Sequence, residues 1–133
     1  MSDRVVLGFL EEVWNQGRVG SAELFVAPDY EVPGVGKGPA AVAENAGTFR
    51  VAFPDLRLDV IDVVADVQRV AVWMQLSGTH LGPFRGYPPT RRHAMWDEVG
   101  FFVVEDERII RARFLADMLA LRKSLGVIPE DLR

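Results

Sequence analysis

Cysteine is absent from this sequence of 133 residues, and histidine occurs only twice, at His80 and His93. The lack of cysteine excludes disulfides, thiolate nucleophiles and thiolate metal sites. The two histidines lie in different segments and form neither an HxH nor an HExxH spacing, so the sequence predicts no metal site. A GxSxG motif, which marks many serine hydrolases, is also missing.

Long hydrophobic runs are missing as well. No apolar segment approaches the ~20 residues that span a bilayer, and the N-terminal stretch MSDRVVLGFLEEVW lacks the pattern of a secretory signal. The net charge is −4, and basic residues cluster only briefly, at Arg91-Arg92 and Arg122-Lys123. We therefore expect a soluble cytoplasmic protein that binds neither membranes nor nucleic acid.

Apolar residues, by contrast, make up 49% of the chain, enough for one domain over residues 1–133 with a real core. Helical spacing of apolar residues predicts helices at 4–15 and 39–53. Alternating patterns predict strands at 56–64, 69–80, 94–104 and 109–116, and a last helix follows Asp117. Helices first and a run of antiparallel strands afterwards indicate an α+β fold.

The last two predicted strands form a hairpin whose register can be written down. If Asp106 and Glu107 are the loop residues, regular pairing places Gly100 opposite Arg113 and Trp96 opposite Asp117. One face would then carry Trp96, Glu98, Gly100, Phe102, Arg111, Arg113, Leu115 and Asp117. We expect this face to line a cavity under the N-terminal helices, with the apolar opposite face against a second subunit; the alternative is an ordinary solvated face.

Asp117 stands where a strand pattern changes into a helix pattern in apolar surroundings. Burial there would raise the pKa of its carboxyl, as a general acid/base requires. The alternative role is N-cap of the last helix, and the two roles are compatible.

Several motifs together resemble the SnoaL-like polyketide cyclase family, within the superfamily of ketosteroid isomerase and nuclear transport factor two. They are FPDL at 53–56, GTH followed by GPFRGYPPT at 78–90, and the terminal DMLALRKSLG at 117–126. Weaker matching stretches run nearly end to end. The resemblance implies a cone-shaped barrel in which a long curved antiparallel sheet wraps around N-terminal helices and ends in a C-terminal helix.

The same resemblance implies a cofactor-free enzyme that closes a ring in a polycyclic polyketide by intramolecular aldol condensation. Asp117 matches the family's general acid/base, and His80 matches the histidine of its GTH motif. Trp14 and Tyr30 match pocket aromatics. The sequence departs from the family pattern at Ala112-Arg113, at the EDERI turn and at Arg91, which leaves the substrate and the reaction type open.

Other residues extend this hypothesis. His80 would hydrogen-bond the substrate or its enolate, or else make a structural bond at a strand end. Glu98 would raise the pKa of Asp117 and Arg113 would oppose it, unless the two form a cross-strand ion pair. Flat substrate rings would pack on apolar side chains that are otherwise ordinary core: Trp14, Tyr30, Phe49, Met74 and Trp96.

Three functions follow from these alternatives. The first is a cyclase that acts through Asp117 on a hydrophobic, polycyclic small molecule. The second is a related hydroxylase or epoxide hydrolase. The third is a non-catalytic ligand-binding protein, favoured if Arg113 neutralises Asp117. An apolar outward sheet face predicts a homodimer or homotetramer.

Overall fold

The structure is a computed structural model that describes residues 2–128. Helix α1 (Ser2–Phe9) continues into the π-helical segment η1 (Leu10–Asn15), and the 3-10 helix η2 (Val19–Leu24) follows. A two-stranded ribbon of β1 (Glu31–Val32) and β2 (Gly36–Lys37) leads into helix α2 (Gly38–Ala52). Pro39 lies in the first turn of α2, where its missing N–H costs no hydrogen bond.

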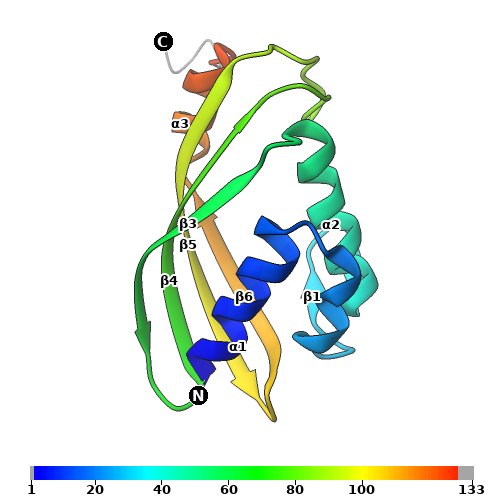
Figure 1. Cartoon of the computed structure of the whole chain (residues 1–133), viewed down its shortest axis with the longest axis vertical. Helices are drawn as coiled ribbons and strands as arrows, with labels where there is room; N and C mark the ends of the chain where they lie inside the picture. The colour runs from blue at the N-terminus through cyan, green and yellow to red at the C-terminus, as the bar shows by residue number, and fades with distance from the viewer. Residues whose placement is uncertain (1, 129–133) are drawn as a thin grey trace.

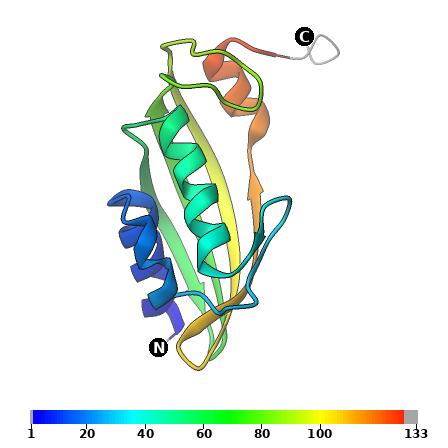
Figure 2. The ribbon, with the colours of Figure 1, turned by 90° about the vertical axis from the view of Figure 1, so that its right-hand side faces the viewer.

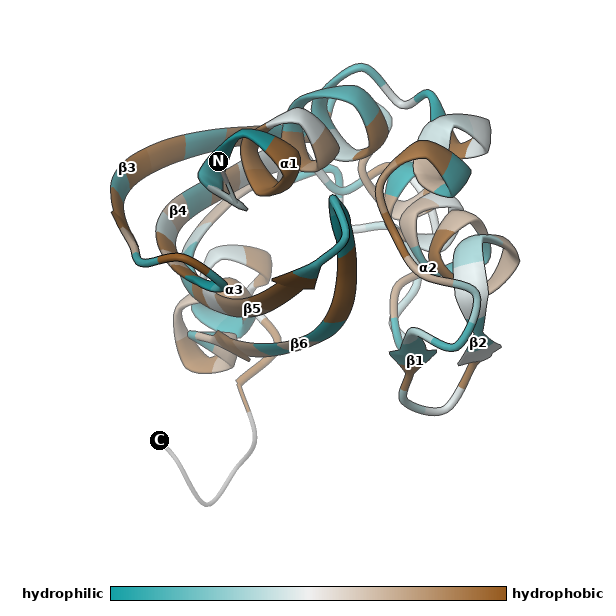
Figure 3. Cartoon of the chain, turned by 90° about the horizontal axis from the view of Figure 1, so that it is seen from below, coloured by the Kyte–Doolittle hydropathy of each residue, from teal (hydrophilic) through white to brown (hydrophobic). Residues whose placement is uncertain are grey.

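The second half of the chain forms one antiparallel sheet. Its strands β3 (Arg57–Ala65), β4 (Arg69–Thr79), β5 (His93–Glu105) and β6 (Arg108–Ala116) lie in chain order, each paired with the next. The sheet curves around the helical side of the molecule (Figure 3). In the described chain β3 and β6 are the two edges, so the sheet is open, where the expectation was a barrel.

The core lies between the concave face of the sheet and the helices. Helix α2 runs across this face, with α1 beside it (Figure 2). Alternate residues of the two central strands turn inward, with Val70, Val72, Met74 and Leu76 on β4 and Ala94, Trp96, Phe102 and Val104 on β5. They meet Val6 and Phe9 of α1, Leu10 and Val13 of η1, and Val42 and Ala46 of α2. This packing fixes which side chains face the interior.

Helix α3 (Met118–Leu125) closes the described chain at the end of the sheet opposite the N-terminus (Figure 1). It buries Leu121 and Leu125, whereas Leu119, which belongs to the same apolar repeat in the sequence, is 38% exposed. Gly126 ends the helix in the left-handed conformation, with φ 73°, in which a glycine meets no steric penalty.

The β5–β6 hairpin confirms the predicted turn and corrects the predicted register. Asp106 and Glu107 both have positive φ, 49° and 59°, and Glu105 pairs with Arg108. A β-bulge then shifts the pairing, since Val104 is opposite Ile109 while Val103 is opposite Arg111. Ile110 is the extra residue. The regular pairing assumed from the sequence is therefore wrong by one residue beyond the bulge.

Ile109 explains why the strand needs this extra residue. Its side chain is fully buried, and its backbone donates to Phe25 O (2.7 Å) and accepts from Ala27 N (2.9 Å). Ala112 and Phe114 also face inward, opposite Phe102 and Gly100. Inward positions of a regular strand are two residues apart, so Ile109 and Ala112, three residues apart, can both face inward only if one extra residue lies between them.

The bulge decides which residues of β6 reach the interior. Phe114 packs edge-on against Phe102, with ring centroids 5.4 Å apart. Arg113 is instead the cross-strand neighbour of Phe101, and Arg111 that of Val103. The expectation that Arg111, Arg113 and Leu115 share the face of Glu98 is thus wrong, because Glu98 lies opposite Ala116.

Candidate active site

A cavity of about 400 Å³ opens between the helices and the sheet, the size of a small-molecule site. Trp14 and Phe49 form one wall, edge-on with ring centroids 5.5 Å apart. Most of the remaining lining is apolar and comes from every strand of the sheet and from the first turn of α3. It consists of Leu10, Leu58, Met74, Leu76, Phe114, Leu115, Ala116 and Met118, together with the polar residues Asn45, Arg85 and Glu98.

Glu98 is the carboxyl group of this cavity. It lies on β5 between Met74 of β4 and Ala116 of β6, and its side chain is half-buried. Burial raises its pKa above the usual glutamate value, while a hydrogen bond from Trp96 and the charge of Arg85 oppose the shift. The indole Nε1–H donates to Oε1 at 3.4 Å. An apolar wall with one such carboxyl suits general acid/base chemistry.

A second lobe of about 160 Å³ adjoins the main cavity and shares Trp14, Asn45 and Phe114 with it. Tyr30 lines this lobe and is 4% exposed. Burial raises the pKa of the Tyr30 phenol to about 12, so the group stays neutral and can act as a hydrogen-bond donor. The two lobes therefore have Trp14, Asn45 and Phe114 as common lining residues.

Asp117 occupies a different environment. It is exposed and caps α3, with Oδ1 accepting a hydrogen bond from Ala120 N at 3.0 Å. Its own N–H donates to Asp97 O at 2.9 Å, whereas regular pairing predicted a position opposite Trp96. Ala116 and Met118 line the main cavity and Asp117 itself does not. The structure therefore places this carboxyl at the rim of the site.

His80 lies below the surface, away from the lining of both lobes. Its side chain is fully buried against Phe53 and Phe84, at centroid distances of 5.5 and 6.5 Å. Nδ1 accepts from Thr90 N at 3.1 Å, which places the proton of the neutral ring on Nε2. Nε2 has no hydrogen-bond partner in the described chain. Burial lowers the pKa of His80 and so favours this neutral form.

The residues expected to bind substrate are distributed unevenly. Trp14, Phe49, Met74 and Glu98 line the main cavity and Tyr30 the second lobe. Trp96 is buried beneath them and reaches the site only through its bond to Glu98.

Arg113 does not line either lobe, and the ion pair considered between it and Glu98 is not made. The ion pairs of residues 2–128 are Arg18–Glu12 and Arg57–Asp59, both at the surface.

The lining also contains Asn45, Arg85 and Phe114, which were not among the predicted site residues. Asn45 is a polar residue in the middle of α2, where the other inward positions are apolar, and this is a signal that was available. Arg85 lies in the loop after β4, whose path the sequence does not specify. Phe114 was assigned to the wrong face because of the bulge.

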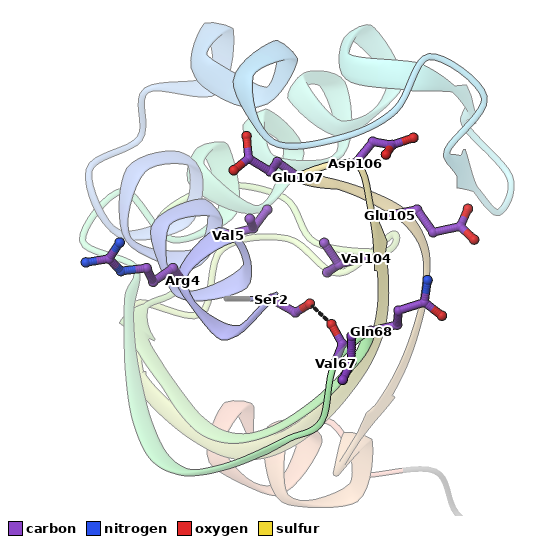
Figure 4. Close-up of a pocket in the computed structure, with 9 residues that line it drawn as sticks. All are labelled: Ser2, Arg4, Val5, Val67, Gln68, Val104, Glu105, Asp106 and Glu107. Carbon is purple, nitrogen blue, oxygen red and sulfur yellow. Dashed lines mark hydrogen bonds between the residues drawn. The ribbon is translucent and has the colours of Figure 1, made fainter.

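Another hollow, of about 370 Å³, lies at the opposite end of the sheet (Figure 4). It is formed by the start of α1 and the β3–β4 and β5–β6 turns, and the Ser2 hydroxyl donates to Val67 O across it. The side chains of Glu105, Asp106 and Glu107 extend from the turn around it. Its open walls combine polar residues with Val5, Val67 and Val104.

Among residues 2–128, no group of three or more histidine, aspartate or glutamate side chains is placed to hold a metal ion. Within the same range no helix is long and apolar enough to cross a bilayer.

Comparisons with known proteins agree with this architecture. A family model described as SnoaL-like polyketide cyclase matches residues 4–125. Nogalonic acid methyl ester cyclase of Streptomyces nogalater is 29% identical over 119 residues, which cover 85% of this chain and 89% of that protein.

Solved structures extend the likeness over nearly the whole fold. TsrD of Streptomyces laurentii superposes with a TM-score of 0.87 at 23% identity, covering 95% of each chain. AclR of Streptomyces galilaeus, a proposed hydroxylase, gives a TM-score of 0.81 at 25% identity, covering 96% of this chain and 97% of its own. IdmH of Streptomyces antibioticus, a proposed polyketide cyclase, gives 0.80 at 25% identity, covering 96% and 99%.

Proposed function

Because the chain belongs to the SnoaL-like polyketide cyclase family, we propose that it closes a ring of a polycyclic polyketide by intramolecular aldol condensation in the main cavity. No cofactor takes part in the proposed reaction. The observation that carries the proposal is the half-buried Glu98 carboxyl, with its raised pKa, in an otherwise largely apolar lining. The relative named nogalonic acid methyl ester cyclase supports ring closure as the reaction.

In the proposed reaction one carboxyl group moves one proton. The Glu98 carboxylate takes a proton from the carbon between two carbonyl groups, which breaks a C–H bond and leaves an enolate. The enolate carbon then bonds to the carbon of a second carbonyl, whose oxygen receives the electron pair. Protonated Glu98 returns the proton to that oxygen. A carboxyl whose pKa is raised above its usual value is suited to both steps.

The walls of the cavity serve the same reaction by holding the substrate. Trp14 and Phe49 present aromatic surfaces to a flat ring system, and Met74 adapts to its edge. Tyr30 and Asn45 offer hydrogen bonds at the second lobe. Such positioning brings the two reacting carbons of a flexible chain together, which accounts for much of the rate enhancement in ring closures.

Asp117 remains the second candidate for the acid/base, on the strength of its family match. Its place at the rim, beside Ala116 and Met118, puts it one residue from the lining. Its exposure and its cap bond to Ala120 favour the structural role. His80, the other residue proposed from the sequence as catalytic, is better suited to hold the β4–β5 loop at Thr90.

The experiment that tests the proposal is turnover of anthraquinone-type β-ketoesters by wild type, Glu98→Gln and Asp117→Asn. We expect Glu98→Gln to lower kcat by about 100-fold or more and Asp117→Asn to retain most of it. The reverse ranking would return the acid/base role to Asp117. Binding without conversion by wild type would contradict the cyclase function.

A hydroxylase is the second candidate function, and the likeness to AclR supports it. Product mass separates the alternatives, because an intramolecular aldol closure leaves the molecular formula unchanged. Hydroxylation adds one oxygen atom, and epoxide hydrolysis adds the elements of water. A product heavier than its substrate would replace the cyclase proposal with the corresponding alternative.

We also propose that two copies associate through the outer face of the sheet. Trp73, Met95, Val99 and Phe101 are between 45% and 48% exposed there, and large apolar patches commonly mark interfaces. Phe101→Glu should yield a monomer in analytical ultracentrifugation, with Val67→Glu, at an exposed turn, as the control. A wild-type monomer at micromolar concentration would contradict this proposal.

A further inference from the structure

The geometry points to Arg85 as the residue that binds an anionic oxygen of the ligand at the mouth of the main cavity. This inference rests on the proposed function in one respect, since the anion is taken to be an acidic oxygen of a flat aromatic ligand. It adds a binding group that none of the sequence motifs indicated.

The loop that carries Arg85 is fixed at both ends. After β4, the N–H groups of Leu81 and Gly82 donate to Ala52 O at 2.9 and 3.2 Å, which ties the loop to the end of α2. Before β5, Thr90 N donates to His80 Nδ1 at 3.1 Å, and Arg91 N donates to His80 O at 2.8 Å. A loop held in this way can present a side chain in a defined place.

The turn at the tip of the loop aims Arg85 at the cavity. Phe84 and Tyr87 exchange two backbone hydrogen bonds, of 3.0 and 2.8 Å, around Arg85 and Gly86. Phe84 is 5% exposed and packs on Phe49 and Phe53, at centroid distances of 5.6 and 5.4 Å. The Arg85 guanidinium lies 5.3 Å from the Phe84 ring centroid, within cation–π range.

Arg85 itself lies in the left-handed conformation, with φ 47°, at the tip of this turn. Its side chain is part of the lining of the main cavity.

The charged residues of the cavity indicate what Arg85 binds there. Among the described residues that line the main cavity, Arg85 is the one cation and Glu98 the one carboxylate. When Glu98 takes a proton from the substrate, the negative charge moves from the carboxylate to the enolate oxygen. Arg85 is then the charge that remains to balance it, and a guanidinium can donate two parallel hydrogen bonds to such an oxygen group.

The test measures binding and does not depend on turnover. Quenching of tryptophan fluorescence gives the Kd of anthraquinone-2-carboxylate and of its methyl ester, two flat probes that differ in one negative charge. We expect wild type to prefer the carboxylate by about fivefold, the range of a partly exposed ion pair. Arg85→Met should abolish the preference, and Arg85→Lys should keep part of it.

Arg91→Met is the matched control. Arg91 belongs to the same loop, is exposed and also has positive φ, 62°, but it does not line the cavity. Its variant should keep the full preference. Equal binding of the two probes by wild type, failure to bind either, or an equal loss in both methionine variants would overturn the inference.

Turnover of β-ketoesters by the same preparations separates this inference from the proposed function. Ring closure by a wild type that binds both probes equally would leave the cyclase function in place and remove the role of Arg85. A carboxylate preference that depends on Arg85, without ring closure, would keep the anion site and contradict the cyclase function.

Discussion

Two carboxyl groups near the same end of the sheet, Glu98 and Asp117, have opposite environments. Glu98 lies on a central strand, half-buried, with its pKa raised by burial. Asp117 lies where the edge strand ends, exposed, with its carboxylate bonded to a helix N–H. A position at a strand-to-helix junction provides a capping site, whereas a position in mid-strand on the concave face provides the desolvation that acid/base chemistry requires.

The largest expected effect that separates the two carboxyls is on the pH dependence of turnover. As a base Glu98 must be ionised, so kcat/KM should fall about tenfold for each pH unit below its raised pKa. The acid limb should therefore have its midpoint above 4.5, the ordinary glutamate value. A pH–rate profile of Asp117→Asn should keep this limb. Loss of the limb in that variant would reverse the comparison.

A third titratable group tests whether burial alone is sufficient for catalysis. His80 is more buried than Glu98 but lies outside the cavity, so its replacement should affect stability and leave the acid limb of kcat/KM unchanged. His80→Leu leaves Thr90 N–H without its acceptor and should lower the free energy of unfolding by about 2 kcal/mol. Urea titrations measure this, and His80→Asn, which keeps an acceptor, should cost less.

The same residue gives a pH dependence with a definite sign. Because burial lowers its pKa, the neutral ring stabilises the fold fully above pH 6.5, the ordinary histidine value. This contribution declines as the pH falls from there through the lowered pKa. The thermal stability of wild type should be measured from about one pH unit above 6.5 to about two pH units below it. Over this range wild type should lose stability that His80→Leu does not lose.

A smaller effect is expected from the cap of α3. Asp117→Ala should lower the free energy of unfolding by about 1 kcal/mol, because Ala120 N–H loses its acceptor. Asp117→Ser, which can still cap, is the control and should lose less. Chemical denaturation of both variants measures the difference. Equal stability of the alanine variant and wild type would contradict the structural role assigned to this residue.

The smallest effect concerns the stability cost of the Glu98 carboxyl in the main cavity. Burial raises the pKa of Glu98 in the folded state. Its contribution to stability is therefore fully present below about pH 4.5 and is lost as the pH rises through the raised pKa. Glu98→Gln should therefore be slightly more stable than wild type at pH 7 and equal to it at pH 4. A gain at both pH values would point to packing rather than ionisation.

Much of the fold follows from local sequence patterns. The predicted strands agree with β3 to β6 to within a residue or two at their ends, because alternation survives wherever one face of a strand is buried. The turn at Asp106-Glu107 was placed correctly from the two apolar runs on either side of it. The absence of pairing between the edge strands β3 and β6 could not be predicted from the sequence. Closure of a sheet into a barrel depends on its curvature and strand number, which no local pattern specifies.

The candidate site was less accessible to sequence reasoning. Ile109 and Ile110 are adjacent and both apolar, so the change of alternation at the bulge leaves no mark in the pattern, and the face of Arg113 was assigned wrongly. Glu98 was correctly given an inward position because the register of β5 does not depend on the bulge. Arg85 could not be placed, because a loop with three prolines has no period to follow.

The bulge at Ile110 bears on how such chains are compared across evolution. The strand carries one residue more than its pairing uses, so a relative that lacks this residue would keep the inward positions of Ala112 and Phe114. A relative of full length with a straight strand would instead turn Arg111 and Arg113 inward. Conservation of length along β6 is therefore a poor guide to conservation of pocket chemistry, and an alignment without gaps there can pair residues from opposite faces.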